Sequence, residues 1–168
     1  MRLAGTAQVS AVDGPGLRFV IFTQGCLHQC PHCHNPDSWE LNGGEEHSVK
    51  QVIRLLKKQK KKLRGVTFSG GEPFLQAAEL AEVAQAARQL GWDVVTYTGF
   101  TYEELIEDGS DSVKALLSTS DILIDGRYIH KLRDTKLQFR GSANQRIIDV
   151  AATQKSGRIV LWHKSGAS

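Results

Sequence analysis

The chain has 168 residues, and its 21 Lys and Arg against 18 Asp and Glu give a formal net charge of only +3. This length is typical of one compact domain, so we expect residues 1–168 to form a single domain. The near balance of charge argues against nucleic acid or another strong polyelectrolyte as a partner. There are only three cysteines, within eight consecutive residues, which excludes the even, dispersed set of a secreted disulfide scaffold.

The sequence also lacks the signals of membrane insertion. Its N-terminal residues hold no apolar stretch of signal-peptide length, and no run approaches the ~18 apolar residues of a membrane span. We therefore expect a cytoplasmic protein with no membrane partner.

Strand-like and helix-like segments alternate along the chain. Residues 17–23 are apolar and rich in strand-forming residues, which predicts a buried strand ending near Gly25. Ser48 and Gln51 have the spacing of a capping box, and the helix that they open is expected to stop near Gly65. Further strands are expected at 66–68, 92–97, 121–125, 146–150 and 158–162, and further helices at 76–90, from 101 with a break at 109, and at 113–117. Residues 126–143 are polar and expected to be mostly loop.

Repeated strand–helix units predict an α/β fold with a parallel sheet or a partial barrel. A complete eight-fold barrel typically needs ~250 residues, so this chain is too short to close one. We expect an open, partial parallel β/α barrel of about five or six strands.

Cys26, Cys30 and Cys33 form a C-x3-C-x2-C cluster directly after the first predicted strand. Thiolates this close together indicate a shared metal. Zinc sites close with four ligands, and a histidine among residues 28–34 would complete a Cys3His set. Iron–sulfur clusters normally take four cysteines, so three would leave one iron open to a substrate or cofactor. Because no second ligand pair follows downstream, the pattern favours an iron–sulfur cluster, with zinc as the alternative.

This spacing after a first strand resembles the signature of radical S-adenosylmethionine (SAM) enzymes. In that family three cysteines bind a [4Fe–4S] cluster, and the amino and carboxylate groups of SAM chelate the fourth iron. Residues 69–73, Ser-Gly-Gly-Glu-Pro, resemble the family's Gly-Gly-Glu motif, whose backbone contacts the SAM amino group. Gly70 and Gly71 would let the backbone approach a ligand closely, and Glu72 would lie beside a cationic amine.

Within this family the chain is similar to the glycyl-radical activating enzymes. Residues 13–18, Asp-Gly-Pro-Gly-Leu-Arg, and residues 33–36, Cys-His-Asn-Pro, match their pattern. Segments 97–101, 123–128 and 140–146 resemble the members that act on an anaerobic ribonucleotide reductase. The resemblance covers roughly residues 13–150, and the short length agrees with it because activases of pyruvate formate-lyase are longer.

The resemblance implies a partial barrel of the radical SAM type, a [4Fe–4S] cluster and SAM. It also implies one-electron chemistry carried by the cofactors. The reduced cluster would cleave SAM to methionine and a 5′-deoxyadenosyl radical, which would remove an α-hydrogen from one glycine of the reductase. The implied partners are the anaerobic ribonucleotide reductase and an electron donor such as flavodoxin or another reductant. Another glycyl-radical enzyme or a small molecule as target, and a non-catalytic zinc module, are the alternatives.

The resemblance also implies roles for single residues. Cluster ligation falls to the three cysteines, while His32, Cys33, His34, Gly70, Gly71 and Glu72 are expected around SAM. His32 stands where the family usually has an aromatic residue against the adenine, and an imidazole can stack similarly. Asp125 ends the fourth predicted strand, where related activases place an acidic residue close to the SAM carboxylate; a helix-cap or loop Asp is the equal alternative.

Three further features have simpler interpretations. For the basic run at 57–64, a solvated helix end is the favoured interpretation, and a docking patch for an acidic partner or electron donor is the alternative. Segment 140–146 is interpreted equally as a turn and as a partner-recognition or site-lining segment. Trp39, Trp92 and Trp162 are expected to serve in packing.

Overall fold

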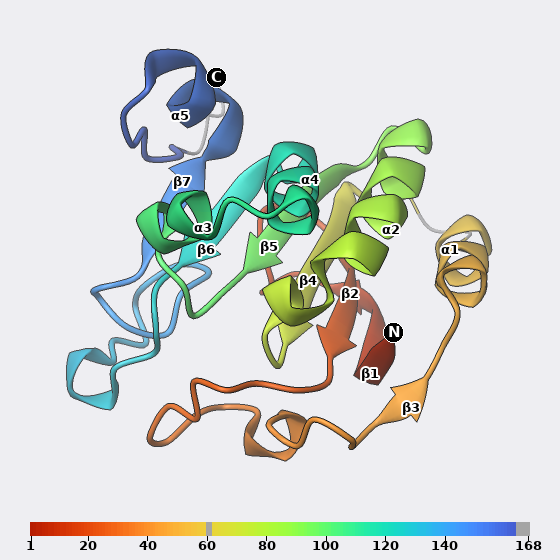
Figure 1. Ribbon diagram of the computed structural model, residues 1–168, viewed down its shortest axis with the longest axis horizontal. Helices are drawn as coiled ribbons and strands as arrows, with labels where there is room; N and C mark the ends of the chain where they lie inside the picture. The colour runs from red at the N-terminus through yellow and green to blue at the C-terminus, as the bar shows by residue number, and fades with distance from the viewer. Residues whose placement is uncertain (60–61, 164–168) are drawn as a thin grey trace.

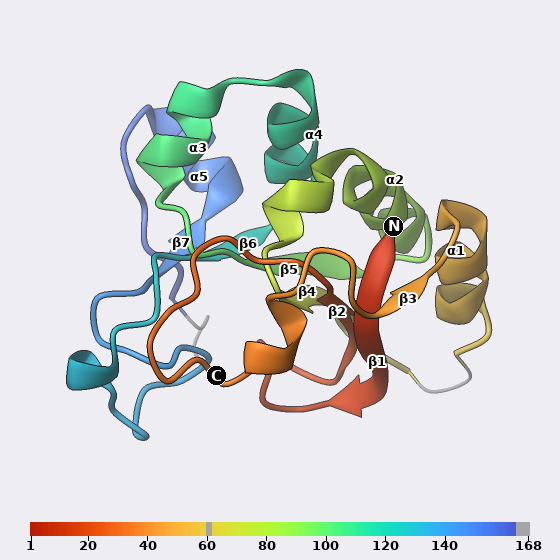
Figure 2. The ribbon, with the colours of Figure 1, turned by 60° about the horizontal axis from the view of Figure 1, so that its bottom comes forward.

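The structure is a computed structural model that describes residues 1–59 and 62–163 (Figure 1). Its centre is a seven-stranded sheet with the strand order β3-β1-β2-β4-β5-β6-β7. The five α-helices of the described residues lie on one side of this sheet, as Figure 2 shows. The strands are β1 (Arg2–Ser10), β2 (Arg18–Thr23), β3 (Glu45–Glu46), β4 (Gly65–Gly70), β5 (Asp93–Tyr97), β6 (Ile122–Asp125) and β7 (Arg146–Asp149). The helices are α1 (Val49–Lys57), α2 (Ala77–Gln89), α3 (Tyr102–Asp108), α4 (Asp111–Thr119) and α5 (Val150–Ser156).

The four central strands, β2, β4, β5 and β6, are parallel. Helix α1, helix α2 and the pair α3–α4 connect them in turn, which confirms the predicted alternation and the α/β class. The expectation of five or six parallel strands was wrong at both edges of the sheet. Strands β1 and β3 extend one edge and β7 the other, all by antiparallel pairing, and the sheet does not close.

Strand β1 is absent from the sequence-based prediction because only one of its side chains, Leu3, is buried. The positions that face inward are Leu3, Gly5, Ala7 and Val9, and the small Gly5 and Ala7 among them give only a weak apolar alternation.

Two element ends also differ from the prediction. The helix expected to stop near Gly65 ends at Lys57, because the chain must run extended into β4, where the Arg64 N–H donates to the Leu17 carbonyl (2.7 Å). Lys60 and Lys61 of the basic run lie outside the described residues. The strand expected at 158–162 is only an isolated bridge between Ile148 and Leu161.

The unpredicted helix α5 follows β7 directly. The carboxylate of Asp149 ends the strand by capping this helix at the Ala152 N–H (2.9 Å). The capping box predicted at Ser48 is confirmed, and Thr101 forms a second capping box with Glu104 at the start of α3.

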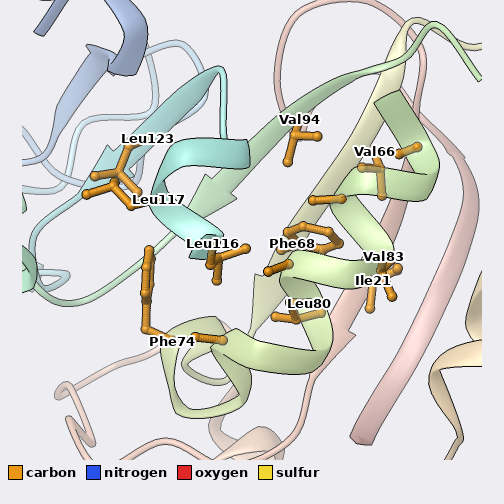
Figure 3. Close-up of a cluster of buried hydrophobic side chains, with 14 of the residues drawn as sticks. Ile21, Val66, Phe68, Phe74, Leu80, Val83, Val94, Leu116, Leu117 and Leu123 are labelled. Carbon is orange, nitrogen blue, oxygen red and sulfur yellow. The ribbon is translucent and has the colours of Figure 1, made fainter. Parts of the chain in front are cut away.

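The main hydrophobic core lies between the sheet and the helices (Figure 3). Phe68 of β4 packs beneath Leu80 and Val83 of α2, and alanines on the same face of α2 are also buried, which brings this helix close to the sheet. Alternate strand residues face the opposite side, where Val95, Ile122 and Ile124 form a second, smaller cluster. Trp92 and Trp162 pack against these two clusters, as expected.

The buried guanidinium of Arg18 fixes the loop before β2. It donates to Thr67 Oγ1 (2.8 Å) and to the Pro15 carbonyl (2.9 Å), and it pairs with Asp93 (2.6 Å). Thr67 Oγ1 in turn donates to the Asp13 carbonyl (2.7 Å). These bonds hold residues 13–15 against the side of the sheet that faces away from the helices.

No helix in the described parts of the chain has the length and apolar character needed to cross a membrane.

Candidate cofactor site

A cavity of about 470 Å³ lies where the parallel strands end. The carboxyl ends of parallel strands meet at one edge of a sheet, and the loops that follow them build sites there. The loops after β2, β4, β5 and β6 all contribute to this cavity. Of the residues predicted for the cofactor site, the cavity is lined by Cys26, Cys30, Cys33, His34, Gly70, Gly71 and Glu72.

The cysteine loop, residues 24–39, turns back on itself directly after β2. The amide of Gly25 donates to the Ser38 carbonyl (2.8 Å), and the amide of Cys26 donates to the Trp39 carbonyl (3.0 Å). Cys26 is buried, whereas Cys30 and Cys33 are half-buried, and all three thiols are free. The loop thus directs its three sulfur-bearing side chains to one cavity.

Burial raises the pKa of the Cys26 thiol, and the same cause raises the pKa of the Cys30 thiol. A bound metal would have to displace these protons, because the thiolate is the ligand.

The Gly-Gly-Glu turn is joined to the start of the cysteine loop. The amide of Gly71 donates to the Thr23 carbonyl and that of Glu72 to the Gly25 carbonyl, both at 2.8 Å. A Cβ atom on Gly70 would lie 2.6 Å from the Thr23 nitrogen, and one on Gly71 would lie 2.3 Å from the Gly25 oxygen. The two glycines are therefore required by the close approach of two chain segments, a reason that the sequence alone did not reveal.

The carboxylate of Glu72 is the centre of this junction, and its residue is only 1% exposed. Its Oε1 accepts from the Phe74 N–H (3.0 Å) and from Thr98 Oγ1 (2.9 Å). Its Oε2 accepts from the Gly99 N–H (2.8 Å) and lies 3.0 Å from His28 Nε2. One buried carboxylate thus joins the loops that follow β2, β4 and β5.

His28 fills the remaining space in this junction. Its ring packs edge-on against Phe100, with centroids 4.5 Å apart. A Cβ atom on Gly99 would lie 2.3 Å from the ring, so a residue without a side chain is required there. The sequence offered His28 only as a possible zinc ligand, whereas the structure pairs it with Glu72.

Segment 126–145 forms the outer wall of the cavity. Gln145 organises it: its Nε2 donates to the Gly126 carbonyl (3.0 Å), and its Oε1 accepts from the amides of Gly141 (2.9 Å) and Ser142 (3.1 Å). Tyr97 Oη donates to the Phe139 carbonyl (2.6 Å), and burial raises the pKa of this tyrosine. Segment 140–146 is therefore both a turn and a site-lining segment.

Two of the predicted SAM-site residues do not line the cavity. His32 is exposed, and its ring lies against that of His130, with centroids 4.2 Å apart. Asp125 is buried, and it accepts hydrogen bonds from the Tyr102 amide (2.8 Å) and Arg146 Nε (3.0 Å). The arrangement around Asp125 is a helix cap combined with an ion pair.

Two lining residues have polar atoms that the sequence did not single out. The Nε1 atom of Trp39 and the Nε atom of Arg140 are buried, and neither has a hydrogen-bond partner within the part of the chain that the structure describes. Both are N–H donors, so they suit a ligand that carries acceptor oxygens. Trp39 follows the Cys-His-Asn-Pro match closely, and this was the signal in the sequence for a position at the cavity.

The described residues contain no group of three or more His, Cys, Asp and Glu side chains arranged to hold a single metal ion.

Comparison with known proteins decides the family. Residues 12–148 match the family described as a 4Fe-4S single cluster domain. Over 145 residues the chain is 37% identical to the "Anaerobic ribonucleoside-triphosphate reductase-activating protein" of Vibrio cholerae, covering 82% of this chain and 90% of that protein. This chain belongs to the 4Fe-4S single cluster domain family. A member of the same name from Escherichia coli K12 is 30% identical over 145 residues, covering 82% of this chain and 91% of that protein.

The family also confirms the wider resemblance to activating enzymes. The "Pyruvate formate-lyase-activating enzyme" of Listeria monocytogenes is 35% identical over an alignment of 170 residues, covering 96% of this chain and 66% of that enzyme. The iron–sulfur interpretation of the cysteine cluster thereby gains support over the zinc alternative.

Proposed function

We propose that this protein is a radical SAM activase that generates a glycyl radical on an anaerobic ribonucleotide reductase. One observation carries the proposal: the three cysteines and the Gly-Gly-Glu turn line the same cavity in a chain of this family. The names of the relatives that match most of the chain supply the target.

We also infer that the sheet is an open barrel of the radical SAM type and that residues 1–168 form one such domain. Four parallel strands with their connecting helices on one side, and a cavity at their carboxyl ends, support this inference.

The residues of the cavity fit a [4Fe–4S] cluster and SAM. In this proposal Cys26, Cys30 and Cys33 hold the cluster through three irons, which leaves the fourth iron for SAM. The cavity volume lies within the ~300–1,000 Å³ usual for small-molecule sites. The unpartnered donors of Trp39 and Arg140 are suited to the carboxylate or ribose oxygens of such a ligand.

The remaining predicted residues divide by their place in the structure. His34, Gly70, Gly71 and Glu72 are proposed to surround SAM. Roles for His32 and Asp125 at the cofactor stay predictions, because neither residue lines the cavity.

When bound, the cluster and SAM supply the one-electron chemistry that removes an α-hydrogen atom from the target glycine. The chain itself holds the cofactors, shields the cavity from water and admits a loop of the protein substrate. The junction at Glu72 fixes the cysteine loop relative to the ends of β4 and β5. The wall ordered by Gln145 and Tyr97 limits access of water to the cavity, while the unclosed sheet leaves room for a protein loop to enter.

Anaerobic reconstitution with iron and sulfide tests this function. We expect a brown protein with about four iron atoms per chain that forms a glycyl radical, seen by electron paramagnetic resonance, when it is mixed with the reductase, SAM and dithionite. Cys26→Ser should lower the iron content and abolish the radical. A colourless protein that binds one zinc ion and forms no radical would overturn the proposal.

Pyruvate formate-lyase is the second candidate target, because the Listeria activating enzyme aligns with nearly the whole chain. Presenting both target enzymes to the reconstituted protein decides between them, since only the true target should acquire the radical at a catalytic rate.

A further inference from the structure

The outer wall of the cavity includes an exposed basic segment. Residues 127–136, here called the basic loop, connect β6 toward β7 and contain one acidic residue, Asp134. Four exposed cations lie on this loop, and none of them forms an ion pair with any residue that the structure describes. They are Arg127, Lys131, Arg133 and Lys136.

The basic loop also exposes apolar side chains. Ile129 is 41% exposed and Leu132 is 43% exposed. Apolar residues surrounded by charge are the usual composition of a transient protein interface, in which the apolar part is buried and the charged rim guides association.

The basic loop lies directly against the cysteine loop. The ring of His130 stacks on that of His32 at 4.2 Å, and the ring of Tyr128 lies 4.9 Å from that of His34. These two histidines flank Cys33 in the sequence. Figures 1 and 2 show the same neighbourhood, with the cyan helical turn of the basic loop beside the orange cysteine loop. A protein bound here would be separated from the cysteines by little more than a layer of aromatic rings.

The basic run at 57–64 has no such position. Its described members Lys57 and Lys58 lie at the end of α1, on the opposite side of the molecule from the basic loop (Figures 1 and 2). Arg64 is bonded to Leu17, which precedes β2, whereas the cysteine loop follows β2. A partner on this run would therefore meet the end of the sheet that is remote from the cysteines.

We propose that the basic loop is the docking surface for an acidic redox protein that delivers the electron to the cluster. The inference rests on the proposed function, because it requires a cluster on the three cysteines. In each encounter one electron leaves the partner's reduced centre and is accepted at the cluster, so the partner is oxidised by one electron and no bond is made or broken.

An electron donor fits this surface better than the reductase does. An electron can pass through a layer of aromatic side chains, so its donor can remain on the outer side of the cavity wall. A glycine that loses a hydrogen atom must instead enter the cavity itself. Acidic charge on the donor would complement the four cations and speed its association at low ionic strength.

The test uses two variants with the same change in net charge. Lys131→Glu/Lys136→Glu alters the basic loop, and Lys57→Glu/Lys58→Glu alters the end of α1. An acidic flavodoxin is titrated into each reconstituted protein by calorimetry at low and high salt. We expect the basic-loop variant to bind about tenfold more weakly at low salt, with the difference shrinking as salt screens the charges. The α1 variant should bind like the unaltered protein.

A second measurement follows the absorbance of the cluster. Reduced flavodoxin should reduce the basic-loop variant about tenfold more slowly, whereas dithionite should reduce all three proteins to the same extent. Unchanged flavodoxin binding in the basic-loop variant would overturn the proposal. So would a raised KM for the reductase with dithionite as reductant, because that result would assign the surface to the reductase. Failure of the proposed function would appear separately, as the absence of a glycyl radical from the unaltered protein with dithionite.

Discussion

Replacing Glu72 with Gln tests the junction that fixes the cysteine loop. Each carboxylate oxygen accepts two donors, one of which is a backbone N–H: that of Phe74 at Oε1 and that of Gly99 at Oε2. A Gln side chain turns an NH2 group toward one of these pairs. The hydroxyl of Thr98 can rotate and the ring of His28 can change tautomer, but a backbone N–H must donate.

One buried N–H therefore loses its acceptor in either orientation of the Gln amide. Such a loss costs about 1–3 kcal/mol, and the remaining hydrogen bonds lose the strength that a charged acceptor gives them. We expect Glu72→Gln to lower the free energy of unfolding by about 2–4 kcal/mol. Urea denaturation of the metal-free protein in a reducing buffer measures this change, and hydrogen exchange at Gly99 should accelerate at least about tenfold.

Glu104→Gln is the matched control. Glu104 is exposed and accepts from the Thr101 amide (2.7 Å) as the third residue of a capping box, a position that Gln fills equally well. The control should change stability by less than about 0.5 kcal/mol. If Glu72→Gln falls within the range of this control, the four hydrogen bonds of Glu72 do not hold the junction together, and the reasoning is wrong.

The other predictions concern a buried tyrosine and a close-packed glycine. Burial raises the pKa of Tyr97, so above pH ~10 the unfolded state loses this proton first and stability falls by up to ~1.4 kcal/mol per pH unit. Tyr97→Phe should lower the free energy of unfolding by about 1 kcal/mol at pH 7, because the hydrogen bond to the Phe139 carbonyl is lost. The difference in stability from the unaltered protein should shrink above pH ~10. A difference that stays constant in urea denaturation from pH 7 to 11 would contradict this. Gly99→Ala should displace His28 and lower the free energy of unfolding by about 1–3 kcal/mol. In the control Gly5→Ala the added Cβ atom meets no atom within 4 Å, so stability should hardly change. Equal urea midpoints for the two variants would refute the packing argument.

The central strands could be predicted because local sequence reports their burial. Strand β2 is buried along nearly its whole length, so its apolar run is continuous. The edge strands give no such signal. Pairing of β1 with β2 depends on contacts between distant residues, and Leu3 alone among the β1 side chains is buried.

In the candidate cofactor site, too, local patterns could be predicted and long-range contacts could not. The cysteine spacing and the Gly-Gly-Glu turn are local patterns, and the structure places both at one cavity. Glu72 contacts His28, which lies 44 positions earlier in the sequence, and Gly99, which lies 27 positions later. Only the fold brings these three residues together. Asp125 lies at the end of β6, as the resemblance implied. Its ion pair with Arg146, however, depends on the pairing of β6 with β7, which the local sequence does not indicate.

The long segment between β6 and β7 explains why the sequence left two interpretations of residues 140–146. A segment without regular structure must still satisfy its buried backbone groups. Gln145 does so for the amides of Gly141 and Ser142 and for the carbonyl of Gly126, so the turn is also the wall of the cavity. The side chains of the four exposed cations on the basic loop make none of these hydrogen bonds, so they can vary without altering the wall. Exposed cations on the basic loop are thus free to serve partner recognition, which is the role that the docking experiment tests.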